Sequence, residues 1–245
     1  TEEYSKNVKL ASNAIVEMNK SYKTTITAMG EMANASKDAK GEFIALCEGD
    51  DHWNNPKKLQ QQYNYMLSNK DVVICYHNAY NVDHENTLIS ESKLTARQKR
   101  SYSSFEMMSG GVFILTLTAF YRNVFDYKDY PWESKYVVNG DIFLFSVLGQ
   151  FGGGAYLGHI ENAVYRTHNG GIWSKKIDTY KKTQNFNTRY WLAEYYRRLG
   201  SYPKVEDALR MRCVHIIFSD YTVIRIIRAV SHNIFSVFRQ KIRGN

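Results

Sequence analysis

Three acidic side chains, Glu48, Asp50 and Asp51, follow directly after the short apolar run 42–47. The run has the length and composition of a buried strand, and the acidic residues form a polar turn after it. In open α/β sheets, ligands bind just beyond the carboxyl ends of strands. Clustered carboxylates there repel one another unless a cation neutralises them, and hard oxygen ligands suit Mg²⁺ or Mn²⁺. The pattern therefore favours a divalent-cation site over an acidic surface turn.

Two later residues are further candidates. Asp141 precedes the apolar run 142–148, which predicts a helix, so its position is typical of a residue that caps the helix. His168 ends the strand-like run 164–168 and is either a structural histidine or a ligand. We expect the tryptophans beside these motifs, Trp53 and Trp173, to be packing residues. Four other histidines have no ligand-like spacing and are assigned no role: His52, His77, His84 and His159.

Three motifs together resemble the family 2 glycosyltransferases with the GT-A fold. Residues 41–62, Gly-Glu-Phe-Ile-Ala-Leu-Cys-Glu-Gly-Asp-Asp-His-Trp-Asn-Asn-Pro-Lys-Lys-Leu-Gln-Gln-Gln, resemble that family's Asp-x-Asp metal motif and the helix start after it. Residues 139–144, Asn-Gly-Asp-Ile-Phe-Leu, resemble the acidic motif that supplies the catalytic base. Residues 165–174, beginning Tyr-Arg-Thr-His, resemble the stretch that closes the donor site. The motifs occur in the family's order, and the resemblance covers about residues 20–175.

The resemblance implies a metal-dependent, inverting hexosyltransferase that uses a nucleotide-sugar donor. Asp50 and Asp51 would bind Mn²⁺ or Mg²⁺, with His168 as a further metal ligand or a phosphate contact. Glu48 stands where the family has Asp, and it would contact the donor's ribose or a metal-bound water. Asp141 would remove the proton from the acceptor hydroxyl. The implied acceptor is a glycan or a lipid-linked glycan of surface polysaccharide synthesis.

The rest of the chain predicts an α/β fold, with a parallel sheet that helices cover, in keeping with the Rossmann-like GT-A fold. Strands are expected at 42–47, 72–76, 112–118 and 164–168. Helices are expected at 22–39, from Pro56, at 142–148 and from Ile177 onward. The succession strand, helix, strand between 42 and 76 predicts a βαβ unit and thus a parallel sheet. The polar stretch 84–104 is expected to be a mobile loop.

The charge distribution divides the chain into two parts. Residues 1–174 contain 17 Lys and Arg against 19 Asp and Glu, a net charge of −2. Residues 175–245 contain 15 against 5, a net charge of +10. We therefore expect a GT-A catalytic domain over 1–175 and a helical, basic extension over 176–245 that meets an anionic surface.

The extension is predicted to lie on a membrane rather than to cross it. Apolar residues recur at helical spacing between 213 and 238, with arginines toward the other side, which is typical of an interfacial helix. Packing of the same apolar face on the catalytic domain is the alternative. Nucleic acid is not an expected partner, because the sequence lacks the interleaved aromatic and basic residues of known nucleic-acid-binding modules. No long apolar run is present, and the cysteines are far apart, so we expect a cytoplasmic protein, peripheral on the cytoplasmic face of the membrane.

The chain departs from the family at its start. The family's two opening strands, whose loops hold the nucleotide base, have no counterpart before residue 41, which suggests that residues are missing upstream. Two alternatives to the glycosyltransferase therefore stay open. One is a membrane-associated scaffold derived from a transferase. The other is a nucleotidyltransferase or polymerase fragment, in which Gly-Asp-Asp occupies the turn of a hairpin.

Overall fold

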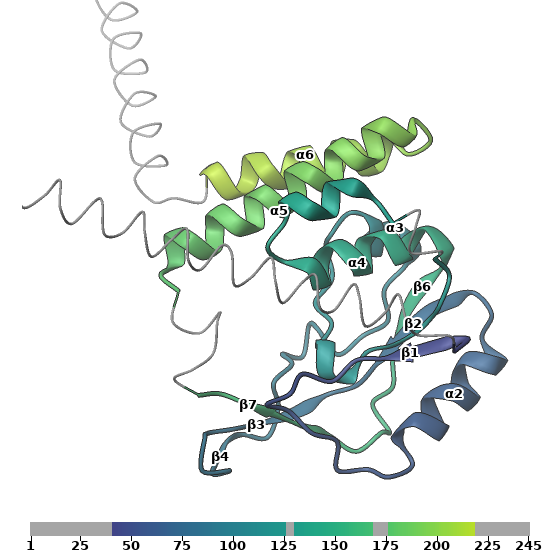
Figure 1. The fold of residues 1–245 in the computed structure, drawn as a ribbon, viewed down its shortest axis with the longest axis vertical. Helices are drawn as coiled ribbons and strands as arrows, with labels where there is room; N and C mark the ends of the chain where they lie inside the picture. Colours follow the sequence, from purple (N-terminus) through teal and green to yellow (C-terminus); the bar gives the residue numbers. More distant parts are fainter. Residues whose placement is uncertain (1–40, 126–129, 169–175, 219–245) are drawn as a thin grey trace, which may run out of the picture.

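The computed structural model describes residues 41–125, 130–168 and 176–218, which form a mixed α/β structure (Figure 1). The broad fold class expected from the sequence is therefore confirmed. The helix expected at 22–39, the side chain of Trp173 and the basic stretch after 218 lie outside the described residues.

The larger sheet contains four strands in the order β1-β5-β2-β6. They are β1 (Phe43–Ala45), β5 (Phe120–Arg122), β2 (Val72–Tyr76) and β6 (Gly153–Tyr156). β5 pairs antiparallel with both β1 and β2, whereas β2 and β6 pair in parallel. Every residue of β2 is buried, because a strand lies on each side and helices cover both faces.

The predicted parallel βαβ unit was wrong in its strand pairing. Its three elements form, with helix α2 (Lys58–Ser68) between β1 and β2. The two strands are not neighbours, however, because β5 lies between them and bonds to both. The sheet is consequently mixed, and its central backbone groups find partners from a segment far along the chain.

A smaller sheet forms beside the first. It contains β4 (Leu88–Ser90), β3 (Ala79–Val82) and β7 (Ala163–Arg166), in the order β4-β3-β7. β3 pairs in parallel with β7 and antiparallel with β4. The stretch expected to be a loop at 84–104 therefore contains a strand, whose three residues are too few to stand out from the polar segment around them.

The strand predicted at 112–118 was also wrong. Residues Thr116–Thr118 form a short 3₁₀ helix, and the strand β5 begins only at Phe120. The Thr118 hydroxyl donates to the carbonyl oxygens of Leu115 and His77, each at 3.0 Å. These local bonds satisfy a buried turn, and an apolar run alone does not distinguish a buried turn from a buried strand.

Helices cover both faces of the larger sheet (Figure 1). On one face, Met66 of α2 packs with Cys75 and Phe120. On the other face lie α3 (Ser104–Met108) and α4 (Gly140–Leu148), which packs Leu144 and Phe145 against the sheet. The helix predicted at 142–148 is confirmed.

A further helical layer lies beyond α4. It consists of α5 (Asp178–Leu199) and α6 (Pro203–Phe218), as the helical pattern after Ile177 predicted. Gly200, with φ of 70°, ends α5 in the left-handed region that glycine adopts without strain. Apolar side chains of α4, α5 and α6 share one core, including Phe143, Leu192 and Leu209.

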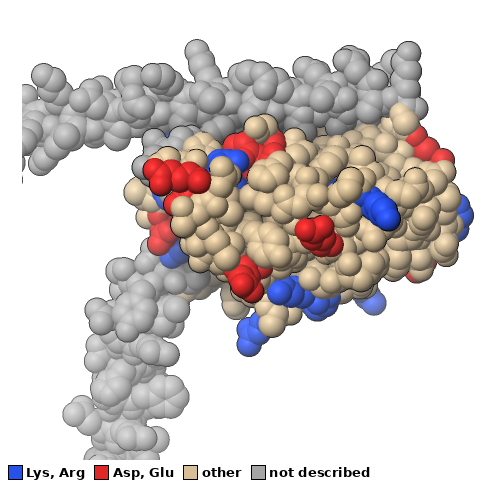
Figure 2. Space-filling view, turned by 90° about the horizontal axis from the view of Figure 1, so that it is seen from below, with Lys and Arg blue, Asp and Glu red and all other residues tan. Residues whose placement is uncertain are grey.

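The described surface seen from below carries both signs of charge (Figure 2). Lys and Arg side chains alternate there with Asp and Glu among a majority of other residues. None of the helices in the described part of the chain has both the length and the apolarity needed to cross a bilayer.

Candidate functional site

The acidic turn lies at the carboxyl end of β1. The Leu46 N–H donates to the Ala119 carbonyl at 3.1 Å, which keeps the chain beside β5 as it leaves the strand. The Asp51 N–H then donates to the Glu48 carbonyl at 3.1 Å and closes a tight turn. The chain continues from this turn into α2, whereas the polymerase alternative requires a strand hairpin at this point. The turn therefore presents its carboxylates at a strand end, as the sequence predicted.

Strand β7 binds this turn from the side. His52 and Val164 exchange two backbone hydrogen bonds, of 3.2 and 2.9 Å. Two stretches that are more than a hundred residues apart in sequence, the acidic turn and the Tyr-Arg-Thr-His stretch, are thereby held side by side. The backbone pairing explains how His168, just after β7, reaches the turn.

Asp50 and His168 are in direct contact. The Nε2 atom of His168 lies 2.9 Å from Oδ2 of Asp50. Both side chains are partly accessible, with 29% of His168 and 45% of Asp50 exposed. Two of the residues predicted to bind the metal are thus brought together at an open position.

Asp51 points to a different partner. Its Oδ1 atom accepts the backbone N–H of Arg166 at 2.8 Å. The Arg166 guanidinium donates through Nε to the Asp50 carbonyl at 3.0 Å, so Arg166 holds both acidic residues. Arg166 was not among the residues predicted from the sequence, although Arg166 lies inside the stretch that resembles the family's donor-closing motif.

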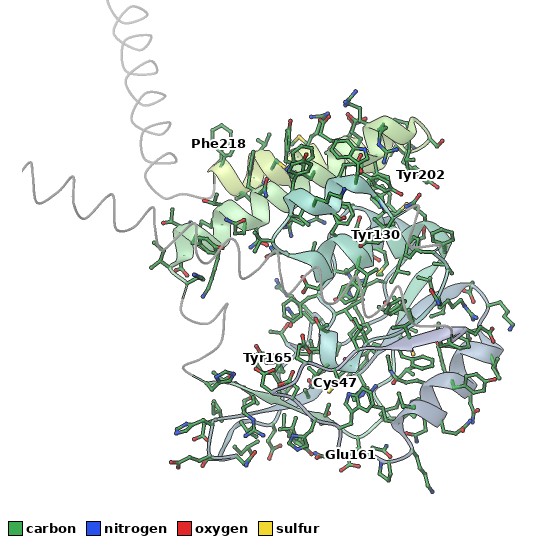
Figure 3. The ribbon with its side chains drawn as sticks, in the orientation of Figure 1. Cys47, Tyr130, Glu161, Tyr165, Tyr202 and Phe218 are labelled. Atoms are coloured by element: carbon green, nitrogen blue, oxygen red, sulfur yellow. The ribbon has the colours of Figure 1, made fainter. Side chains whose placement is uncertain are left out.

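Lys93 supplies a positive charge beside the turn. Its ammonium group lies 3.7 Å from the centroid of the Tyr165 ring, and its charge opposes the rise in the pKa of Asp51. Figure 3 shows Tyr165 near Cys47 at the end of β1. Lys93 belongs to the stretch expected to be a loop, and an isolated lysine in a polar segment gave no signal for this placement.

The gathered charges change the protonation of Glu48. Its side chain is exposed, yet the protein surrounds it closely enough that desolvation, followed by the charge of Asp51, raises its pKa to about 7. A hydrogen bond to Thr116 opposes this rise, and the charge of Asp141 adds to it. Glu48 and Asp141 are therefore within electrostatic range of each other, although 93 positions separate them in the sequence.

Asp141 occupies the first turn of α4 but does not cap it. The helix begins at Gly140, and the capping position belongs to Asn139, whose side chain makes no capping bond. The Asp141 carboxyl accepts backbone N–H groups, including that of Ile142, while burial raises its pKa. Part of its surface stays accessible. Asp141 is therefore not the N-cap residue, but its carboxyl still satisfies free N–H groups of the first turn, as the capping alternative expected, at the positive end of the helix.

Trp53 fixes the far end of the acidic turn. Its indole N–H donates to the Leu117 carbonyl at 2.6 Å, and its ring packs against the main core, as expected. The Lys58 ammonium lies 4.1 Å from the centre of the same ring and donates to Gln62 at 2.6 Å. The turn is consequently held at one end by β7 and at the other by the start of α2.

Of the three residues predicted to bind the metal, the structure brings Asp50 and His168 together, while Asp51 is turned to the N–H of Arg166. Among residues 41–125, 130–168 and 176–218, no three His, Cys, Asp or Glu side chains are positioned to hold a metal together. Two adjacent ligands of an octahedral ion at about 2.1 Å lie about 3 Å apart, which matches the Asp50–His168 separation. Oxygen and imidazole ligands suit Mn²⁺, whose remaining positions substrate oxygens and water fill.

Comparison with known proteins gives relatives without a described activity. No family model matches the chain. Uncharacterized proteins of Mycobacterium bovis and of two strains of Mycobacterium tuberculosis are each 30% identical to it over 150 residues. The match covers 61% of this chain and 42% of each relative, so the chain spans less than half of their length.

Proposed function

We propose that the protein is a metal-dependent, inverting glycosyltransferase that moves a hexose from a nucleotide-sugar donor to a hydroxyl of a glycan. The observation that carries the proposal is the meeting of three separate segments. His168, after β7, contacts Asp50, after β1, while Asp141 of α4 is close enough to Glu48 to influence its pKa. The contact between Asp50 and His168, with a second carboxylate within electrostatic range of Glu48, supports the proposal.

At the donor side, Asp50 and His168 would hold Mn²⁺ or Mg²⁺. Bound there, the ion supplies neutralising charge for the diphosphate as it leaves the sugar. Arg166 keeps Asp50 and Asp51 in position through its backbone N–H and its Nε atom. Glu48 lies beside them and is suited to a hydroxyl of the donor, since its carboxyl group exists in both protonation states near pH 7.

At the acceptor side, Asp141 would accept the proton of the attacking hydroxyl. The hydroxyl oxygen forms its bond to the anomeric carbon as the bond from that carbon to the diphosphate oxygen breaks, which inverts the configuration. The raised pKa of Asp141 supports this assignment, because a base is most effective when its pKa approaches the working pH. The acceptor is proposed to be a lipid-linked glycan at the cytoplasmic face of a membrane.

The test is turnover of UDP-, GDP- and dTDP-sugars with and without Mn²⁺. We expect release of the nucleoside diphosphate only with the metal, and Asp50→Ala should lower the rate by roughly a hundredfold or more. Asp141→Asn should lower turnover by about 10²–10⁴-fold while Mn²⁺-dependent binding of the nucleoside diphosphate stays normal.

Glu161→Gln is the matched control. Glu161 is an exposed acid before β7 and lies away from Cys47 and Tyr165 in Figure 3, so its loss should leave turnover unchanged. Turnover that survives EDTA would contradict the metal-dependent mechanism. Nucleoside diphosphate binding without any turnover would instead indicate a non-catalytic scaffold.

A further inference from the structure

A groove of about 600 Å³ lies between α3, α5 and α6, apart from the acidic turn. Its polar lining includes Arg189, Arg212 and His215, and its apolar lining includes Phe105 and Met211. None of the described residues that line it is acidic. The groove thus combines positive charge with apolar surface.

The two arginines of the groove have no anionic partner among the residues that the structure describes. Arg189 donates only to neutral oxygens, those of Asn185 at 3.0 and 3.3 Å and of Gly110 at 3.4 Å. Burial first, and then the charge of Arg212, lowers the pKa of Arg189. The Arg212 guanidinium lies over Gly111, where a Cβ would collide with it. Two like charges are therefore held together with no carboxylate between them.

Arg210, outside the groove, does have acidic partners among the described residues. It is on the same helix, two residues before Arg212, and pairs with Glu206 at 2.9 Å and Glu194 at 3.1 Å. The acidic side chains of this region thus neutralise the arginine on the other side of α6. The groove keeps its positive charge free for a ligand.

The outer face of α6 next to the groove is apolar. Met211, Val214 and Phe218 follow one another at helical spacing and are 63%, 41% and 44% exposed. Figure 3 shows Phe218 directed away from the helical layer. Phe105, on the opposite wall of the groove, is 45% exposed. A ligand that fills the groove would therefore meet apolar side chains on both sides of the arginines.

We propose that this groove binds the phosphate headgroup of an anionic membrane lipid, with the outer face of α6 in the acyl boundary. Arginine is suited to phosphate because its planar fork donates two parallel hydrogen bonds. An exposed apolar helix face beside such cations matches the interfacial mode of membrane binding. A soluble phosphate would leave Met211 and Phe218 in water, whereas a lipid covers both. The inference does not rest on glycosyl transfer.

The experiment is co-sedimentation of the whole chain with two kinds of vesicle, phosphatidylcholine alone and phosphatidylcholine mixed with phosphatidylglycerol. We expect binding only to the anionic vesicles. Arg212→Gln should weaken it roughly fivefold, the effect of about 1 kcal/mol per arginine near an anionic surface. Arg210→Gln removes the same charge from the same helix and should weaken it less than twofold. Circular dichroism and thermal unfolding would verify that both variants fold.

Three outcomes would overturn the proposal. Equal losses in Arg212→Gln and Arg210→Gln would mean that overall charge, not the groove, attracts the vesicles. Wild-type protein that ignores anionic vesicles would exclude the lipid. Stabilisation by inorganic phosphate that depends on Arg212, without vesicle binding, would identify a site for a soluble phosphate. Reduced vesicle binding by Met211→Gln, beside normal folding, would in contrast support the acyl contact.

Discussion

The clustering of carboxylates after β1 makes the ionised form of Glu48 less favourable in the folded protein. Desolvation and the neighbouring charge of Asp51 raise its pKa from 4.5 to about 7. Between these values the folded protein holds a proton that the unfolded chain releases. The stability that Glu48 contributes is therefore complete below about pH 4.5 and is lost as the pH rises through 7.

The variant Glu48→Gln should accordingly be more stable than the wild type at about pH 8, where the wild-type residue is ionised. Because Glu48 is exposed and solvent screens its charge, the gain in unfolding free energy should be about 1 kcal/mol or less. Thermal unfolding at pH 8 and at pH 4.5 would measure it. A gain that is as large at the acidic pH would contradict this explanation.

Lys58 is a second residue whose protonation is coupled to folding. It is 1% exposed, and burial lowers its pKa from 10.5 to about 8. Below pH 8 both the folded and unfolded states hold the proton, so the folded state bears the full cost of a buried charge. As the pH rises toward 10.5, the folded protein releases the proton first, and stability rises.

Lys58→Met removes this titration. Between about pH 7.5 and 9.5 the unfolding free energy of the wild type should rise relative to the variant by about 1–2 kcal/mol. Urea unfolding at both pH values would measure the difference. Lys57→Met, at the exposed neighbouring lysine, is the control and should follow the wild type. A constant difference between Lys58→Met and the wild type would mean that Lys58 stays charged in the fold.

Residue types alone predicted part of the candidate site. Acidic residues after a strand are visible in the sequence, and so are Asp141 before an apolar run and His168 after one. The residues that hold these side chains in place are not visible in the sequence, because the contact of Arg166 to Asp51 uses a backbone N–H. A donor of this kind leaves no trace in side-chain type, and only the pairing of β7 with the turn reveals it.

At the scale of elements, one ion pair joins α5 to the 3₁₀ helix Trp132–Tyr136. Glu133 is fully buried and accepts two hydrogen bonds from the Arg198 guanidinium, at 2.6 and 3.0 Å. Burial of a carboxylate is tolerated only with such a partner, because an unpaired charge in the interior is strongly unfavourable. The pair therefore fixes where α5 lies on the domain.

Arg198→Ala should destabilise the protein by about 2–4 kcal/mol, since it leaves Glu133 buried without a counter-charge. Arg197→Ala, one residue earlier, breaks the exposed pair with Glu194 and should change stability by less than about 1 kcal/mol. Chemical unfolding of both variants would compare them. Equal effects would show that the buried pair contributes no more than an ordinary surface contact.

The buried strand at 72–76 and the helix at 142–148 were predicted well, whereas the segments 112–118 and 88–90 were not. The run 142–148 is apolar enough to form a helix buried almost all round, and α4 forms there. The run 112–118 has a similar composition but ends in a 3₁₀ turn. The Thr118 hydroxyl bonds there to the carbonyls of Leu115 and of the distant His77. Strand β4 was missed because it has only three residues, Leu88–Ser90, within an otherwise polar stretch.

At the scale of the molecule, burial and strand pairing predict a gradient of local stability. β2 is buried along its whole length between two strands, whereas β4 is an exposed edge strand. Native-state hydrogen exchange should therefore find the slowest amides in β2 and much faster ones in β4. Equal protection of the two strands would contradict the prediction.

The order of the larger sheet also determines when the acidic turn can form during folding. The chain makes β1 and β2 first, but both await β5, which comes more than forty residues after β2. Pairings between such distant segments form slowly, because a long loop must close before any contact compensates for it. Within the described part of the chain, neither strand has its β5 partner until Phe120–Arg122 has been produced. The acidic turn therefore takes its final position late, after the residues of α2 and α3 have been synthesised. In that interval the unpaired strands are most exposed to aggregation.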